Sequence, residues 1–280
     1  MATTSAEAQR GRTQTLGLLL REWRAARGVS QLELALRSGF SSRHVSFIET
    51  GRTQPSRQAL LALADTLDVP LRDRNRLLEA AGYAHLYPQT PLDAGEMSHV
   101  RGVLRFLLDR HEPYAAVVLD RCSTCLMGNA AAGRLNAALV DPSLLTPHAN
   151  QLRLVFHPLG ARRWIVNWDD VAHHLLARAE RELAQPPADE AGAPLLAELR
   201  GYGVPATPRP SATSLSPADL LLPIHIRKDG LELRLFSTIM TLGTPKDVTL
   251  QELRLETFFP ADPASEVAWA TLAGASPTPP

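Results

Sequence analysis

The hydrophobic positions in the first third of the chain recur at helical spacing. Leu16, Leu19, Leu20 and Trp23 follow one another at short intervals, and Gly28 ends that segment. Apolar positions between short polar turns continue the pattern further along the chain. They predict four more helices, over 30–37, 42–50, 56–67 and 71–81.

The pattern changes after a stretch over 85–95 that is rich in proline and turn residues, where we place a domain boundary. Apolar periodicity then predicts helices over 97–110, 129–140 and 167–183 and strands over 114–119, 222–227, 231–241 and 250–258. Asp229-Gly230 is a tight hairpin turn between two of these strands. In the helix over 167–183, we expect Asn167 to be the N-terminal cap.

These elements predict an α+β protein with two domains. A domain of five helices spans 14–83, and a mixed domain of helices and strands spans 96–262. Residues 1–12 are small and polar, and we expect a disordered tail there. We also expect irregular loops with one short helix over 185–219, and partial disorder from Ala261 onward.

The second and third predicted helices form a helix-turn-helix signature over 30–56, SQLELALRSGFSSRHVSFIETGRTQPS. Ser30 and Glu33 form a capping box, and Ser41 can cap the third helix. Gly39 stands in the turn, where a positive φ is needed, and Gly51 closes the third helix. The interior positions of the two-helix unit are apolar: Leu34, Phe40, Val45 and Ile48. Constraints over so many positions favour a DNA-binding unit over a plain helical hairpin.

Charge supports that interpretation modestly. Residues 1–85 hold 12 arginines and no lysine against 8 acidic residues, which leaves +4, whereas the whole chain is neutral. A positive first third suits a polyanionic partner.

The segment over about 16–82 resembles the Xre family of transcriptional regulators. The resemblance implies that the second helix docks on the DNA backbone and that the third enters the major groove. It implies a phosphate contact for Gln31 and Arg52 and a structural ion pair between Arg24 and Glu49. Many members carry a polar residue where this chain has Phe47, so we expect Phe47 to be partly buried. The implied DNA-binding residues are Gln31, Ser41, Ser42, Arg43, His44, Phe47 and Arg52.

Residues 96–262 resemble the ligand-binding domain of MmyB-like regulators, which has a PAS-like fold. The matching stretches include AAVVLDRCSTCLMGNAAAGRL, NWDDVAHHLLARAERELA and LPIHIRKDGLELRLFSTIMTLGTPKDVTLQELRLETFFPAD. The resemblance implies a small apolar ligand with the character of a fatty acid. Asn129 matches a turn asparagine of such domains, and we expect it to cap the next helix. The weak candidates for the ligand-binding wall are Phe156, Trp164, Trp168 and Phe236, although an ordinary core role is commoner for each.

Other chemistry finds little support in the sequence. Cys122 and Cys125 form a single C-x-x-C, which lacks the second pair that a structural zinc needs, and a redox pair remains the alternative. No phosphate-binding glycine loop, nucleophile elbow or catalytic triad is present, so we expect no catalytic residues, no metal and no enzyme. We expect no membrane span and no secretory signal, and hence a cytoplasmic protein.

Two hypotheses about function follow. The first is a DNA-binding regulator controlled by the apolar ligand, with double-stranded DNA and a small-molecule effector as partners and a homodimer as the active form. The second is a DNA-binding protein whose C-terminal domain mediates only dimerisation or protein association.

Overall fold

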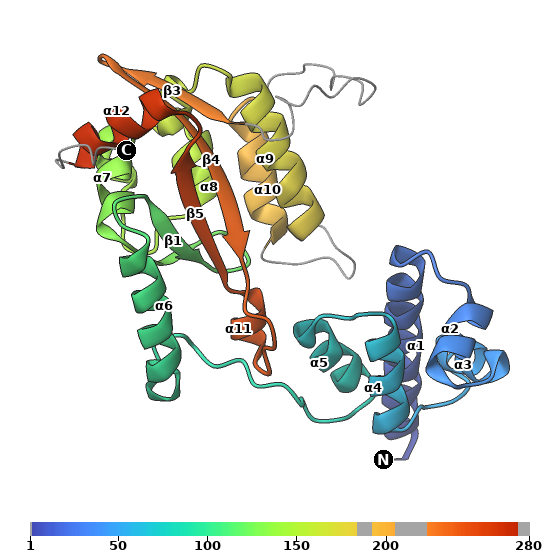
Figure 1. The fold of residues 1–280 in the computed structure, drawn as a ribbon. Helices are drawn as coiled ribbons and strands as arrows, with labels where there is room; N and C mark the ends of the chain where they lie inside the picture. The colour runs from blue at the N-terminus through green and yellow to red at the C-terminus, as the bar shows by residue number, and fades with distance from the viewer. Residues whose placement is uncertain (1, 184–191, 205–222, 274–280) are drawn as a thin grey trace. The chain divides into compact units, whose positions relative to one another are not determined.

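The structure, a computed structural model, describes residues 2–183, 192–204 and 223–273. The chain forms two compact units that divide after Thr90, and Thr244–Gln251 belongs to the first unit (Figure 1). Among the helices in these described ranges, none is long and apolar enough to cross a membrane.

The first unit contains the five helices that the periodicity predicts. They are α1 (Ala2–Ala26), α2 (Gln31–Ser38), α3 (Ser42–Glu49), α4 (Arg57–Thr66) and α5 (Leu71–Ala80). The prediction of a disordered tail over 1–12 is wrong, because α1 already begins at Ala2. Alanine, glutamate, glutamine and arginine dominate this stretch, and their high helix propensity lets the helix continue toward the N-terminus.

The core of the first unit explains why its helices assemble. Leu16, Leu20 and Trp23 of α1 are fully buried, and they pack with apolar residues of the other four helices. Gly17 lies where α1 meets the end of α3: a Cβ at this position would stand 2.4 Å from the carbonyl oxygen of Glu49. The two helices therefore approach more closely than any residue with a side chain allows.

Residues Thr244–Gln251 add a small piece to the first unit. The side chain of Gln251 accepts a hydrogen bond from the Leu71 amide (2.7 Å), and Asp247 accepts one from Thr90 (3.0 Å). The Val248 amide donates to the carbonyl of Pro88 (2.8 Å). All of α11 (Val248–Glu252) except its last residue lies in this segment, so the prediction of a strand from 250 onward is wrong for its first residues. Asp247 accepts from the Leu250 amide and so caps a helical turn before the strand begins.

The second unit is built on a five-stranded antiparallel sheet in the order β2-β1-β5-β4-β3 (Figure 1). The predicted hairpin is confirmed: Asp229 and Gly230 both have positive φ (47° and 84°), which matches the twist of the flanking strands. The short strand β2 was not predicted. The strands are β1 (Ala116–Leu119), β2 (Cys125–Gly128), β3 (Ile224–Lys228), β4 (Leu231–Met240) and β5 (Arg254–Pro260).

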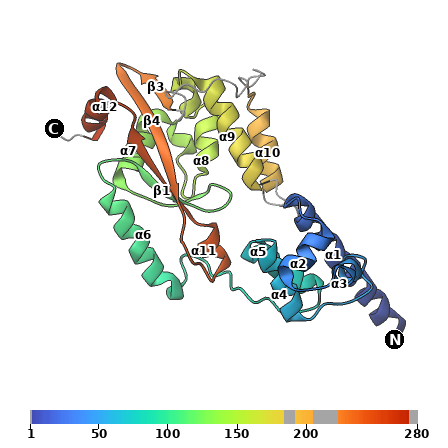
Figure 2. The same cartoon turned by 45° about the vertical axis from the view of Figure 1, so that its right-hand side comes forward.

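Helices pack around this sheet, and α9 and α10 lie side by side in both views (Figures 1 and 2). The longer helices are α6 (Ser98–Arg110), α7 (Ala130–Leu139), α8 (Gln151–Phe156), α9 (Trp168–Leu183), α10 (Gly192–Gly201) and α12 (Pro263–Ala273). Three 3-10 turns join them: η1 (Gly95–Met97), η2 (Pro142–Leu144) and η3 (Ala161–Trp164). The α+β fold class is confirmed.

Three predictions about this unit have distinct outcomes. Asn129 caps α7 as expected, because its side chain accepts from the Ala132 amide (3.0 Å). Asn167 stands at the N-cap position of α9, since its carbonyl accepts from the Val171 amide (3.2 Å), but its side chain bonds to His225 and Pro223 at the start of β3. The partial disorder expected from Ala261 onward does not extend to Pro263–Ala273, because α12 buries Trp269 in the core and its indole N–H donates to the Pro113 carbonyl (2.7 Å); residues 274–280 lie outside the described residues. Parts of the predicted loops over 185–219 lie outside the described residues.

Candidate DNA interface and ligand cavity

The turn between α2 and α3 is built from local capping interactions. Gly39 ends α2 with a φ of 75°, a conformation that residues with a Cβ rarely adopt. The Ser30 and Ser41 hydroxyls then accept from the Glu33 and His44 amides (3.1 Å each). Of the capping box predicted for Ser30 and Glu33, only the bond to the Ser30 hydroxyl forms, because the Glu33 carboxylate pairs with Arg37. The Ser41 cap therefore satisfies the His44 amide in the first turn of α3, and Ser42 and Arg43 in this turn are exposed.

Two arginines share one aromatic ring on α3. The guanidinium of Arg43 lies 5.1 Å from the centre of the Phe47 ring, and that of Arg52 lies 5.7 Å from it. Phe47 is half-buried, as the sequence predicts, while both arginines are exposed. His44 stacks obliquely on Phe40, with ring centroids 5.4 Å apart. Cation–π contact restricts a long side chain, so the Phe47 ring holds one guanidinium group from the first turn of α3 and one from the residues that follow the helix.

A buried carboxylate links α1, α2 and α3. Glu49 has no exposed side-chain surface, and its two oxygens accept from Arg24 (2.6 and 3.0 Å), which confirms the expected ion pair. This hydrogen bond raises the pKa of Arg24 above its usual value. Gln31 also donates to Glu49 (2.8 Å), so its amide is held in place while its second N–H can meet another acceptor. A phosphate contact by Gln31 stays a prediction.

Two residues that support this arrangement were not predicted. Arg21 donates to the carbonyl oxygen of Glu49 (3.2 Å), and Gly17 allows α1 to lie against the same carbonyl. The signal for Gly17 was available, because a glycine inside a helical pattern usually has a packing reason.

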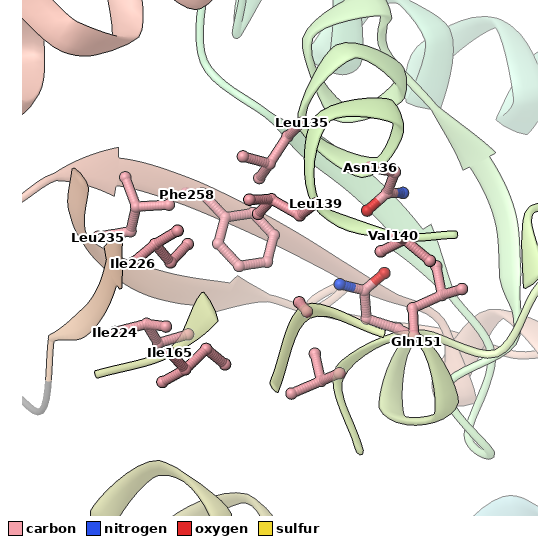
Figure 3. A pocket seen from close by; sticks show the side chains of 13 residues that line it. Leu135, Asn136, Leu139, Val140, Gln151, Ile165, Ile224, Ile226, Leu235 and Phe258 are labelled. Atoms are coloured by element: carbon pink, nitrogen blue, oxygen red, sulfur yellow. The ribbon is translucent and has the colours of Figure 1, made fainter. Parts of the chain in front are cut away.

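The second unit contains a cavity between α7, α8, η3 and strands β3, β4 and β5 (Figure 3). The space between its walls, including the part open to solvent, is about 480 Å³, of which the centres of water-sized molecules can occupy about 50 Å³. Among the described residues that line it, Asn136 and Gln151 are the polar ones. The apolar wall consists of Leu135, Leu139, Val140, Leu154, Val155, Ala161, Ile165, Ile224, Ile226, Leu235 and Phe258.

Comparison with protein families accounts for both units. The MmyB-like transcription regulator ligand binding domain matches residues 100–272, which is more than half of the chain. The chain belongs to the MmyB-like transcription regulators. A helix-turn-helix domain model matches residues 15–77, so this MmyB-like regulator is a DNA-binding transcription regulator.

Solved structures with similarity to the chain cover its first part. The clp gene regulator ClgR from Corynebacterium glutamicum is 37% identical over 25% of this chain and 88% of its own, with a TM-score of 0.23. The restriction-modification controller protein C.AhdI from Aeromonas hydrophila is 37% identical over 22% of this chain and 94% of its own, with a TM-score of 0.22. No curated protein matches the chain.

The four aromatic residues suggested for the ligand wall do not line this cavity of the MmyB-like regulator. Phe156 and Trp168 pack edge to face (centroids 5.2 Å apart) in a separate core with α9 and α10. Trp164 donates to the Leu139 carbonyl and lies under the ammonium of Lys228. Phe236 stacks on Phe259. The cavity wall was missed because its aliphatic residues carry no signal that separates them from ordinary core.

Cys122 lies in the turn between β1 and β2, Cys125 is the first residue of β2, and both are free. Burial raises the pKa of the Cys125 thiol, which disfavours the reactive thiolate. Within the described ranges, no group of three or more His, Cys, Asp or Glu residues is placed to hold a metal ion.

Proposed function

We propose that this MmyB-like regulator binds operator DNA through α3 and that a small apolar ligand, with the character of a fatty acid, controls the binding from the cavity in the second unit. The cavity carries this proposal: of the 13 described residues that line it, 11 are apolar. Ligand sites are commonly concave and apolar, with a few polar groups that orient the ligand.

On the DNA side, we propose that Arg43 reads a base edge and that Arg52 and Gln31 contact phosphates. Arg43 lies in the first turn of α3, the part of a recognition helix that meets base edges. Arg52 follows the helix and shares the Phe47 ring with Arg43, so both guanidinium groups are partly ordered before DNA arrives. Ser41, Ser42 and His44 complete the proposed interface.

A chain-like ligand must widen the cavity. For comparison, an apolar cavity of about 150 Å³ binds a single benzene molecule. The space of about 50 Å³ here is therefore too small for a chain of about 12 carbons. Each buried CH₂ contributes about 0.8 kcal/mol, which can drive the walls apart. A ligand that binds a widened state better than a narrow one shifts the balance between them, as regulation requires.

We propose that α6, which connects with the cavity wall through Phe258, carries the signal. The Phe258 side chain lines the cavity, and its amide donates to the Ala115 carbonyl beside β1 (2.9 Å). His111, at the C-terminal end of α6, places its Nε2 3.4 Å from the Phe258 carbonyl oxygen. Leu104 and Leu108 of α6 are buried. We propose that a displaced Phe258 moves α6, which follows the boundary between the two units in the sequence.

The test is operator affinity, measured on delipidated protein with and without added C12 to C16 fatty acids, on a duplex selected with the purified protein. We expect at least one acid to change the affinity about tenfold or more, which corresponds to about 1.4 kcal/mol. Ile224→Phe, which fills the cavity, abolishes the response. Ile239→Phe, at an exposed position of the same sheet, keeps it.

Two results would contradict this proposal. If no ligand is extracted from native protein and no acid changes DNA affinity, the second unit serves association only. If Ile224→Phe and Ile239→Phe both respond like the unmodified protein, the ligand acts elsewhere than in this cavity.

A further inference from the structure

One segment of the chain belongs to the first unit, although the strands before and after it belong to the second. This segment, Thr244–Gln251, lies in the connection between β4 and β5, and we refer to it as the β4–β5 segment. Both strands contribute to the wall of the cavity, with Leu235 from β4 and Phe258 from β5. A movement of either strand therefore reaches the β4–β5 segment along the backbone.

Gln251 of this segment supplies a hydrogen bond at the start of α5. Its side-chain oxygen accepts from the amide of Leu71, the first residue of that helix (2.7 Å). The first amides of a helix have no partner within it, and a side chain at the N-cap position often accepts from one of them. Pro70 stands at this position, and proline has no side-chain acceptor. Gln251, 180 residues further along the chain, provides an acceptor in its place.

The β4–β5 segment also holds the residues that lead from α5 toward α6. Asp247 accepts from the Thr90 amide (3.0 Å), and Val248 donates to the Pro88 carbonyl (2.8 Å). Both Asp247 and Val248 are buried. The movement proposed for α6 therefore acts on a stretch of chain that the β4–β5 segment already binds.

The packing of α5 connects this segment with the helix proposed to read DNA. Leu77 and Leu78 of α5 are buried in the same core as Leu20 of α1. One turn further along α1, Arg24 pairs with the buried Glu49 of α3 (2.6 Å). A shift of α5 can thus reach α3 through packed side chains and one ion pair, which is the kind of contiguous network that carries coupling between sites.

We propose that the β4–β5 segment transmits the effector signal to the DNA-binding unit, with Gln251 as the positioning residue that ties it to α5. The inference rests on the proposed function, because it requires a molecule in the cavity that changes DNA affinity. When that molecule displaces β4 or β5, the fit of Gln251 on α5 changes. The states with and without the molecule then differ in this hydrogen bond, and a difference between states is what couples two sites.

The experiment measures acid binding and DNA binding separately on the delipidated full-length protein. Isothermal titration gives the dissociation constants of the C12, C14 and C16 fatty acids, and fluorescence anisotropy gives the affinity for the selected duplex with and without each acid. Gln251 is not among the described residues that line the cavity, so we expect Gln251→Met to bind the acids within about twofold of the unmodified protein. This result also shows that the variant folds.

The effect of the acids on DNA affinity is the quantity that Gln251→Met changes. We expect it to fall from about tenfold to roughly threefold or less, because one hydrogen bond accounts for much of a coupling of this size. Gln251→Glu keeps an oxygen that can accept from the Leu71 amide, so it retains the effect. Lys246→Ala, at an exposed position of the same segment, is the control and also retains it.

The outcomes separate this inference from the proposed function. If Gln251→Met keeps the full effect, if Gln251→Glu loses it, or if Lys246→Ala loses it equally, transmission through this hydrogen bond is overturned while the cavity remains the effector site. If Gln251→Met no longer binds the acids, the residue acts on the cavity and the inference is likewise wrong. If no acid changes the DNA affinity of the unmodified protein, the proposed function fails, and the inference falls with it.

Discussion

Phe47 is the residue that organises the proposed DNA contacts, because Arg43 and Arg52 both lie against its ring. We predict that Arg43→Ala costs about 1–3 kcal/mol of operator affinity and relaxes specificity at one base pair. Arg52→Ala weakens binding to all sequences alike and lowers the dependence of affinity on salt, since it removes a phosphate contact. Titrations on matched and mismatched duplexes at several salt concentrations measure both effects. Unchanged affinity in both variants would refute the assignment of this face.

Gly17 is the residue on which the placement of α3 depends. In Gly17→Ala the new Cβ would lie 2.4 Å from the Glu49 carbonyl oxygen, and this backbone atom cannot move without displacing α3. We predict a loss of about 1–3 kcal/mol in the free energy of unfolding, measured with urea, and weaker operator binding. Gly102→Ala is the control: it also lies in a helix, but no atom stands within 4 Å of its added Cβ, so it should be neutral or stabilising. Equal effects of the two changes would show that the close approach is unimportant.

At the scale of elements, we expect the C-terminal end of α6 to be sensitive to acid. His111 packs edge to face on Phe259 (centroids 4.9 Å apart), and burial lowers its pKa below the usual value of 6.5, against opposing effects of the Phe258 carbonyl and Glu112. The unfolded chain therefore binds this proton more readily than the folded one. The stability that His111 contributes is present above its unfolded pKa and is lost as the pH falls through the unfolded toward the folded value.

We predict that His111→Phe, which keeps the ring contact, reduces the fall in melting temperature between pH 7.5 and 5.5. The control is His99→Phe at an exposed position of the same helix, which should leave the fall unchanged. Calorimetry at the two pH values provides the comparison. If His111→Phe shows the same acid sensitivity as the unmodified protein, another group is responsible.

At the scale of the whole molecule, we predict a homodimer on an inverted repeat. A single helix-turn-helix unit covers little DNA, and two-fold symmetry raises affinity and site specificity together. Light scattering at micromolar concentration should give about twice the chain mass of 30.5 kDa. A monomer both on and off DNA would exclude this arrangement. DNA bearing one half-site serves as the control, and its affinity should fall steeply.

The helix-turn-helix unit was readable from the sequence because its determinants are local. The Ser30 and Ser41 caps and the positive φ of Gly39 act within a few residues, and the apolar periodicity of α1 to α5 selects the faces that become buried. The Asp229-Gly230 hairpin was predicted for the same reason, since two residues set its turn.

Only the tertiary structure decided the cavity. Its wall joins Leu135 and Gln151 to Ile224 and Phe258, residues that are far apart in the sequence and meet because α7 and α8 pack against strands β3, β4 and β5. The sequence suggested large aromatic residues for this wall, but packing placed Phe156 and Trp168 in another core and left the cavity to aliphatic side chains. Likewise, the side chain of Asn167 bonds to His225 and Pro223 rather than to the first turn of α9, because a side-chain amide bonds to whichever backbone groups the fold brings within reach. Local periodicity determines which segments are helices and which side of each is apolar, whereas long-range packing determines which apolar residues fill the core and which enclose a space.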